Sequence, residues 1–129
     1  DEGQLPYTPL VRQQPHADAV VRRCEDWLHE NYRGSDAIAC VLQLSGVPER
    51  SLKRRFKAAT GLSLIDYIQN LRVEEAKRLL ESGMLPVDEI SARVGYEEPA
   101  FFRRLFRRCT GLPPGRYRRL FRPVAVPGR

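Results

Sequence analysis

The chain has 129 residues, of which 42% are hydrophobic and 29% charged, and its formal net charge is +6. This length suits one domain of ordinary size or two small helical subdomains, and it excludes two large independent domains. No apolar run reaches the length of a membrane-spanning helix, and no signal peptide precedes the first helical pattern. We therefore expect a cytoplasmic protein that has no membrane partner.

Basic charge is concentrated in two blocks of the sequence. Residues 50–61 carry five basic and no acidic residues, and residues 99–129 carry nine basic and no acidic residues. The rest of the chain carries eight basic and sixteen acidic residues. Two blocks of the same sign repel each other unless a polyanion binds them, so this distribution indicates a negatively charged partner.

The N-terminal part of the sequence predicts a tail followed by two helices. Residues 1–16 contain three prolines and no initiator Met, which is typical of an extended tail or linker within a longer protein. From residue 17 to about residue 30, apolar residues follow the i, i+3, i+4, i+7 spacing of an amphipathic helix. We expect Gly34 to Asp36 to end this helix and to cap a short helix over residues 37–44.

Two further helices are predicted from their boundary residues. Pro48 suits the first turn of a third helix, and Gly61 suits a left-handed cap at its end. Ser63 and Asp66 form a capping-box pattern, which opens a long helix that continues to about residue 82.

The pattern then repeats, with a short helix predicted over residues 87–94 and a basic helix over residues 99–110. At an offset of 50 residues, Arg54, Phe56, Thr60, Gly61, Leu62 and Tyr67 match Arg104, Phe106, Thr110, Gly111, Leu112 and Tyr117. Upstream the offset becomes 49, which pairs Val41 with Ile90 and Gly46 with Gly95. The repeat predicts two helix-turn-helix copies joined by one long helix.

The predicted fold is all-α, because no strand-like alternation with hairpin signals occurs. We divide the chain into a tail (1–16), a first helix-turn-helix subdomain (17–62), a linker helix (63–83), a second helix-turn-helix subdomain (84–122) and a C-terminal tail (123–129).

We predict no catalytic site, no metal and no cofactor. Cys24, Cys40 and Cys109 are far apart and form no C-x-x-C pair, so we interpret them as reduced thiols. His16 and His29 are too far apart for one helical metal site. There is no nucleophile elbow and no phosphate-binding glycine loop, and the paired carboxylates at 74–75 and 88–89 suit solvated or helix-start positions. We therefore expect that the protein is not an enzyme.

Each basic helix separates an apolar face from a basic face. In the first, Leu52, Phe56 and Ala59 pack, and Arg50, Lys53, Arg54 and Lys57 point outward. In the second, Phe102, Phe106 and Cys109 pack, and Arg103, Arg104 and Arg107 point outward. A rigidly held basic helix suits the major groove of double-stranded DNA, where Arg and Lys donate to guanine N7 and O6.

Two alternatives to DNA binding stay open from these residues alone. The basic faces could be solvated surfaces whose aliphatic stems cover the core. They could also belong to a helical module that binds RNA or a protein, although Phe102 and Phe106 lie on the packing face and not on a stacking platform. The length of the joining helix favours DNA: residues 64–82 span about 28 Å, and successive major grooves on one side of B-DNA lie about 34 Å apart.

The segment GLSLIDYIQNLRVEEAKRLLESGMLPVDEISARVGYEEPAFFRRLFRRCTGLPPGRYRRLF resembles the AraC/XylS family of bacterial transcription regulators. The motifs LRVEEAKRLL, VDEISARVGY, FFRRLF and G-x-x-P-x-x-Y-R occur in the family's order, and the resemblance covers residues 17–121. It implies two homeodomain-like helix-turn-helix subdomains bridged by a helix. It also implies a transcription factor that binds specific double-stranded DNA and has RNA polymerase as a partner.

The resemblance also implies which residues face the bases. These positions fall at Arg50, Ser51, Lys53 and Arg54 in the first reader helix and at Pro99, Ala100, Arg103 and Arg104 in the second; Lys57 and Arg107 complete the candidate DNA-binding set. Pro99 and Ala100 have no side-chain donor, so the second reader makes either apolar contact with a thymine methyl group or mainly phosphate contacts. Pro48 stands where the family often has a Ser or Thr cap.

The family usually attaches a sensing or dimerising domain, which we expect as an N-terminal partner of this segment. The lead-in LPYTPL, followed by HADAVVRRCEDWLHENY, is similar to the branch whose N-terminal domain resembles the DJ-1/PfpI class.

Overall fold

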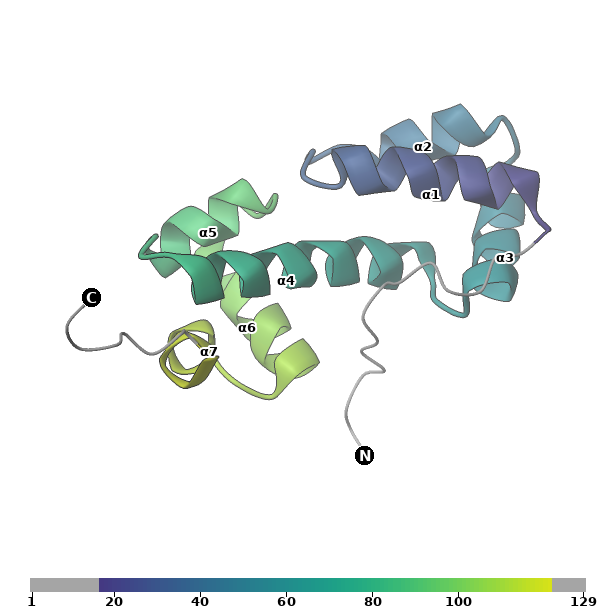
Figure 1. Ribbon diagram of the computed structural model, residues 1–129. Coiled ribbons are helices and arrows are strands. Elements are labelled where there is room, and N and C mark those ends of the chain that lie inside the picture. Colours follow the sequence, from purple (N-terminus) through teal and green to yellow (C-terminus); the bar gives the residue numbers. More distant parts are fainter. Residues whose placement is uncertain (1–16, 122–129) are drawn as a thin grey trace. The chain divides into compact units, whose positions relative to one another are not determined.

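The computed structural model describes residues 17–121, which form seven α-helices and contain no strand (Figure 1). The helices are α1 (Ala19–Asn31), α2 (Ala37–Ser45), α3 (Glu49–Thr60), α4 (Leu64–Ser82), α5 (Val87–Arg93), α6 (Pro99–Thr110) and α7 (Pro114–Phe121). The all-α prediction is therefore confirmed. The predicted tails over 1–16 and 123–129, the lead-in LPYTPL and residue 122 lie outside the described residues.

The chain divides inside α4, between Arg72 and Val73, into two compact units. The N-terminal unit (residues 17–72) contains α1, α2, α3 and the first part of α4, and the C-terminal unit (residues 73–121) contains the rest. Each unit has its own hydrophobic core. One continuous helix therefore supplies apolar side chains to two cores.

The core of the N-terminal unit joins all four of its helical segments. Its buried members are Val21, Cys24, Leu28, Ala37, Val41, Leu52, Phe56, Leu64, Tyr67, Ile68 and Leu71. α1 packs against α2 and α3, so the apolar face of α3 lies against the rest of the unit. The polar face of α3 is thereby turned away from this core.

The core of the C-terminal unit is built in the same way. Its buried members are Val73, Ala76, Leu80, Ile90, Val94, Phe102, Leu105, Phe106, Cys109 and Tyr117. On α4, Val73, Ala76 and Leu80 repeat the i, i+3, i+7 spacing of Val21, Cys24 and Leu28 on α1. The end of α4 therefore contributes buried side chains to the second core at the same spacing as α1 contributes them to the first.

Helix α7 (Pro114–Phe121) was not predicted from the sequence. The start of α7 lies 50 residues after the start of α4, and Tyr117 lies 50 residues after Tyr67. Edge-on ring contacts repeat as well, with centroids 5.0 Å apart for Phe56 and Tyr67 and 5.3 Å apart for Phe106 and Tyr117. The repeat thus extends through α7, which is the counterpart of the first turns of α4.

Both basic helices end in the same local arrangement. Thr60 Oγ1 donates to the Phe56 carbonyl at 2.8 Å and accepts from the Leu62 amide at 3.1 Å. Thr110 makes the same two bonds at the end of α6, at 2.8 and 3.1 Å. The glycine that follows each threonine, Gly61 or Gly111, has φ of 82° or 85°, which confirms the predicted left-handed caps.

The starts of α1 and α3 differ from the predictions, whereas α2 begins at Ala37 as predicted but lacks a side-chain cap. α1 begins at Ala19 and not at Ala17, which is exposed, because the Asp18 side chain accepts the Val21 amide at 3.1 Å and caps the helix. Asp36 occupies the N-cap of α2, but its side chain makes no cap hydrogen bond. Pro48 is the N-cap residue of α3, one position before the predicted first turn.

The predicted cap of α4 is confirmed, since the Asp66 amide donates to Ser63 Oγ at 3.0 Å. α5 ends at Arg93, one residue before the predicted end, and α6 has the predicted bounds.

Arg72 of α4 donates to the Tyr32 carbonyl at 2.8 Å and to the Gly34 carbonyl at 2.9 Å. These two bonds satisfy carbonyls at the end of α1 and fix the turn that follows it.

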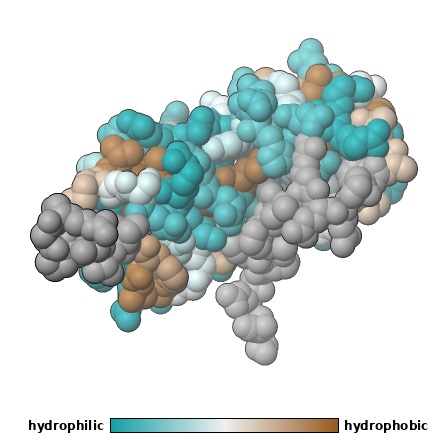
Figure 2. Space-filling model, in the orientation of Figure 1, coloured by the Kyte–Doolittle hydropathy of each residue, from teal (hydrophilic) through white to brown (hydrophobic). Residues whose placement is uncertain are grey.

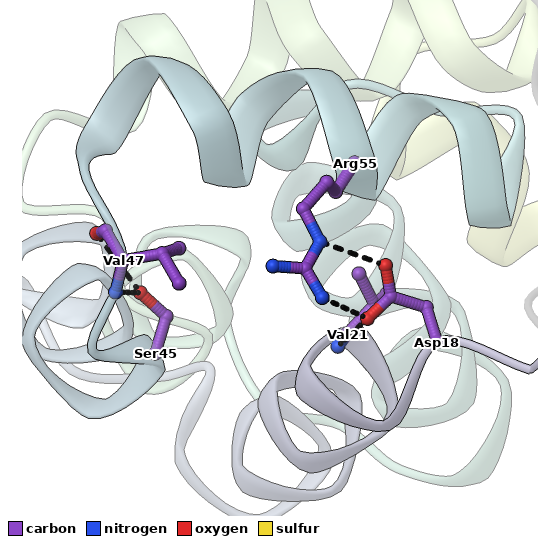
Figure 3. Close-up of polar contacts among 5 residues, drawn as sticks. All are labelled: Asp18, Val21, Ser45, Val47 and Arg55. Atoms are coloured by element: carbon purple, nitrogen blue, oxygen red, sulfur yellow. Dashed lines mark hydrogen bonds and ion pairs between the residues drawn. The ribbon is translucent and has the colours of Figure 1, made fainter.

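An ion pair joins the start of α1 to α3. Arg55 donates through Nε to Asp18 Oδ2 at 3.0 Å and through Nη2 to Asp18 Oδ1 at 2.9 Å (Figure 3). These hydrogen bonds lower the pKa of Asp18 from its usual value. Because the same carboxylate also caps α1, one side chain sets both the start of α1 and its attachment to α3.

We predict that Asp18→Asn lowers the free energy of unfolding by up to about 1 kcal/mol at pH 7, because asparagine keeps the cap but loses the ion pair. The folded pKa of Asp18 is lowered, so its stabilisation is present above the unfolded pKa of about 3.9 and is lost as pH falls towards the folded pKa. Urea unfolding should therefore show a smaller difference between variant and parent at pH 3 than at pH 7. An equal difference at both pH values contradicts this role, and Asp36→Asn is the matched control.

We also predict that Phe56→Ala destabilises the N-terminal unit by about 3–5 kcal/mol, because Phe56 is fully buried in its core. The comparison is Ile65→Ala on α4, where the side chain is half exposed and the expected change is about 0.5 kcal/mol or less. Urea unfolding followed by circular dichroism measures both variants. Similar losses for the two would show that the described core does not carry the stability.

Candidate nucleic-acid interface

α3 presents four basic side chains on the face opposite its buried residues. Arg50, Lys53, Arg54 and Lys57 are all exposed, whereas Leu52 and Phe56 are fully buried. Lys53, Arg54 and Lys57 lie three, four and seven residues after Arg50, so the four side chains form one stripe on the helix surface. Ser51, predicted to face the bases, is only partly exposed and lies to one side of this stripe.

Most of the charges on this stripe are available to a ligand. Within residues 17–121, no carboxylate lies at ion-pair distance from Arg50, Arg54 or Lys57. Lys53 pairs with Glu49 at 2.8 Å, and both side chains are more than half exposed. An exposed pair of this kind contributes little to stability, so Lys53 can leave Glu49 for a phosphate at small cost.

α6 presents the same four helix positions 50 residues later. Ala100, Arg103, Arg104 and Arg107 are exposed, and Phe102, Leu105, Phe106 and Cys109 on the other face are buried. Arg103 pairs with Asp88 of α5 at 2.9 Å. Within the described part of the chain, no carboxylate lies at ion-pair distance from Arg104 or Arg107. Pro99 is only partly exposed.

Corresponding turns hold α3 and α6 in place. In the turn before α3, Ser45 Oγ accepts from the Val47 amide at 3.3 Å (Figure 3). The same oxygen donates to the Leu42 carbonyl at 2.7 Å. Before α6, Ser91 Oγ donates to the Tyr96 carbonyl at 3.0 Å. Each turn contains a glycine with positive φ, at Gly46 and at Gly95. The basic helices are therefore held by packing and by internal hydrogen bonds.

Sequence reasoning missed the acidic partners of the two basic helices. Glu49 lies one residue before the first basic block, and Asp88 comes from a different helix, so counting charges by segment assigned neither to a basic face. Within the described part of the second basic block, it also left three exposed arginines without a role: Arg108, Arg116 and Arg119. Hydrophilic residues cover much of the visible surface, with smaller hydrophobic areas between them (Figure 2).

The described residues show no other kind of site. Among residues 17–121, no group of three or more His, Cys, Asp or Glu side chains is arranged to hold a metal ion. The helices of this part of the chain are all too short or too polar to cross a bilayer. Cys24 and Cys109 are buried, and burial raises the pKa of the Cys24 thiol.

A helix-turn-helix domain family matches residues 42–120, which is more than half of the chain. The C-terminal domain of AraT, a response regulator from Geobacillus stearothermophilus, is 31% identical, with a TM-score of 0.81 over 85% of this chain and 92% of that one. The chain belongs to the AraC-type helix-turn-helix family. The family resemblance found in the sequence is thereby confirmed.

Other members of the AraC-type family show similar matches. The transcriptional activator RhaR from Salmonella dublin is 32% identical over 72% of this chain and 33% of its own length. The transcriptional regulator YpdC from Escherichia coli is 28% identical over 84% of this chain and 38% of its own length. The chain thus spans about a third of the length of these curated relatives. Both relatives are named as transcriptional regulators, which agrees with the class of protein that the sequence predicts.

A solved relative is the DNA-binding domain of AdpA, a global transcriptional factor, in complex with a target DNA. It is 28% identical, and the TM-score is 0.75 over 81% of this chain and 94% of that one.

Proposed function

We propose that this chain is the DNA-binding part of a bacterial transcription regulator and that α3 and α6 each insert their exposed face into a major groove of double-stranded DNA. The observation that carries the proposal is that two helices, built into separate cores, present the same four outward positions, and that seven of these eight positions are basic. Two helices that only face solvent would not need basic residues at the same outward positions. Two copies of a helix that binds in a major groove would need them.

The chemistry of the exposed residues supports this role. Arg50 and Arg54 can each donate two hydrogen bonds to guanine O6 and N7, and Lys57 and Arg107 can bind phosphates on either side. The AdpA domain, which shares this fold, was solved with a target DNA, so the architecture is compatible with a bound duplex.

We further propose that one chain binds two major grooves about one helical turn apart. α4, which joins the two units, has 19 residues, and a helix of that length spans about 28 Å. This is close to the roughly 34 Å between successive major grooves on one face of B-DNA. A single chain would then recognise two short blocks of sequence without dimerising.

An RNA-binding role has less support than DNA binding. Single-stranded RNA is usually read by stacking bases on exposed aromatic side chains. Phe56, Phe102 and Phe106 of the two reader helices are fully buried, and α6 exposes only part of Phe101. Competition between duplex DNA and duplex RNA of the same sequence separates the two functions.

The remaining partners rest on the family resemblance. We propose that the full-length protein acts in the cytoplasm, contacts RNA polymerase and carries an N-terminal sensor or dimerisation domain, of the DJ-1/PfpI-like class. The name of RhaR, a transcriptional activator, agrees with a partner in the transcription machinery.

The experiment that tests the main proposal is selection of bound duplexes from a random DNA pool by the purified chain. We expect a consensus of two short blocks whose centres lie about 10 base pairs apart. Enrichment of salt-sensitive binding without any consensus would contradict sequence-specific recognition by this chain.

We predict that Arg54→Ala and Arg104→Ala each lower affinity for the selected duplex by about 1–3 kcal/mol and relax the preferred base at one position, in the first and the second block respectively. Fluorescence anisotropy at fixed salt measures the affinities. Arg22→Ala, on the exposed surface of α1, is the control and should change affinity little. Unchanged affinity in both reader variants would show that these helices do not bind DNA.

We also predict that Asp88→Asn raises DNA affinity about two- to fivefold, because it removes the carboxylate that competes with phosphate for Arg103. Glu89→Gln is the matched control. It removes the same charge one residue away, from a side chain that pairs with Arg93 and not with a reader residue. Equal gains in the two variants would mean that only net charge matters and that the pair with Arg103 has no specific effect.

A further inference from the structure

We infer that α6 reads the C5 methyl group of thymine through Ala100, whereas α3 reads a base edge by hydrogen bonding through Arg50 at the equivalent position. This inference rests on the proposed function and assigns different chemistry to its two readers. It follows from a contrast between two helices that otherwise have the same framework.

Ala100 lies at the centre of the exposed face of α6. At 100° per residue, it is close to Arg104 and Arg107, and it points away from the buried side chains of Phe102 and Phe106. The equivalent position on α3 is Arg50, which is exposed and has no carboxylate at ion-pair distance among the described residues. The central outward position therefore carries a five-donor side chain in one reader and a single methyl group in the other.

The rest of the first turn of α6 is also apolar. Pro99, Ala100 and Phe101 occupy the positions that Glu49, Arg50 and Ser51 occupy on α3. Phe101 is 37% exposed, and its ring is held against Tyr96, with centroids 5.3 Å apart. A small, fixed apolar surface thus lies at the end of the helix that enters the groove first in other helix-turn-helix proteins.

Charged residues flank this apolar surface and bring a polyanion to it. Arg104 and Arg107 follow Ala100 on the same face, and Arg103 is engaged by Asp88 at 2.9 Å. A phosphate at the tip would find no side-chain donor on Pro99 or Ala100. The thymine C5 methyl is the one apolar group that a natural base pair exposes in the major groove, and alanine is among the residues that contact it.

The test uses the duplex selected from the random pool, with the second block identified as the one that Arg104→Ala relaxes. Each thymine of this duplex is replaced in turn by deoxyuridine, which lacks only the methyl group and keeps the hydrogen-bonding edge. We expect one replacement in the second block to weaken binding about fourfold, as expected for one buried methyl group. Replacements in the first block should have a smaller effect.

Two variants link this effect to the residue. Ala100→Gly removes the side-chain methyl and should bring the thymine to deoxyuridine affinity ratio in the second block close to one. Ala100→Arg introduces the residue of the first reader and should replace the thymine preference with a guanine preference. Arg50→Ala should weaken binding through the first block while leaving the deoxyuridine effect in the second block in place.

Failure of this inference is distinguishable from failure of the proposed function. A two-block consensus whose second block lacks thymine, or tolerates deoxyuridine everywhere, would overturn methyl reading and leave DNA binding intact. An unchanged deoxyuridine effect in Ala100→Gly would show that another residue reads the methyl. Absence of any consensus would overturn both.

Discussion

The structure depends on one helix that is amphipathic towards two different cores. The first part of α4 buries Leu64, Tyr67, Ile68 and Leu71 in the N-terminal unit, and its second part buries Val73, Ala76 and Leu80 in the C-terminal unit. Polar contacts of two tyrosine hydroxyls fix each part. The Tyr67 hydroxyl donates to Glu25 at 3.2 Å and bonds His29 at 2.9 Å, while the Tyr117 hydroxyl donates to Glu81. Each reader helix is therefore anchored through its unit to α4.

The two units have equivalent buried residues but differ at the exposed positions proposed to contact DNA. Phe56 and Phe106, and Thr60 and Thr110, make equivalent contacts at positions 50 residues apart. The outward positions share Arg54 and Arg104 but contain Arg50 in one copy and Ala100 in the other. Packing constrains the buried residues in both copies. An exposed residue has no such constraint, so its identity can differ between copies according to the base that it contacts.

The sequence predicted the reader helices better than the contacts around them. Proline and glycine mark the limits of α3 and α6, because proline is tolerated at the start of a helix and glycine readily adopts the left-handed conformation that ends one. Helix α7 was missed because eight residues give too short a hydrophobic pattern, although the match of Tyr117 to Tyr67 indicated it. Asp18–Arg55 and Asp88–Arg103 join different helices, so no local pattern predicts them.

The central proposal is that the two readers of one chain bind two blocks of sequence on a single duplex. The most direct measurement is the affinity of the chain for the selected duplex after five base pairs, half a helical turn, are inserted between its two blocks. We predict that affinity falls to that of a duplex with only one block, because half a helical turn moves the second block to the opposite face of the duplex. Unchanged affinity would contradict it and would show that the two readers bind independently or that one of them is dispensable.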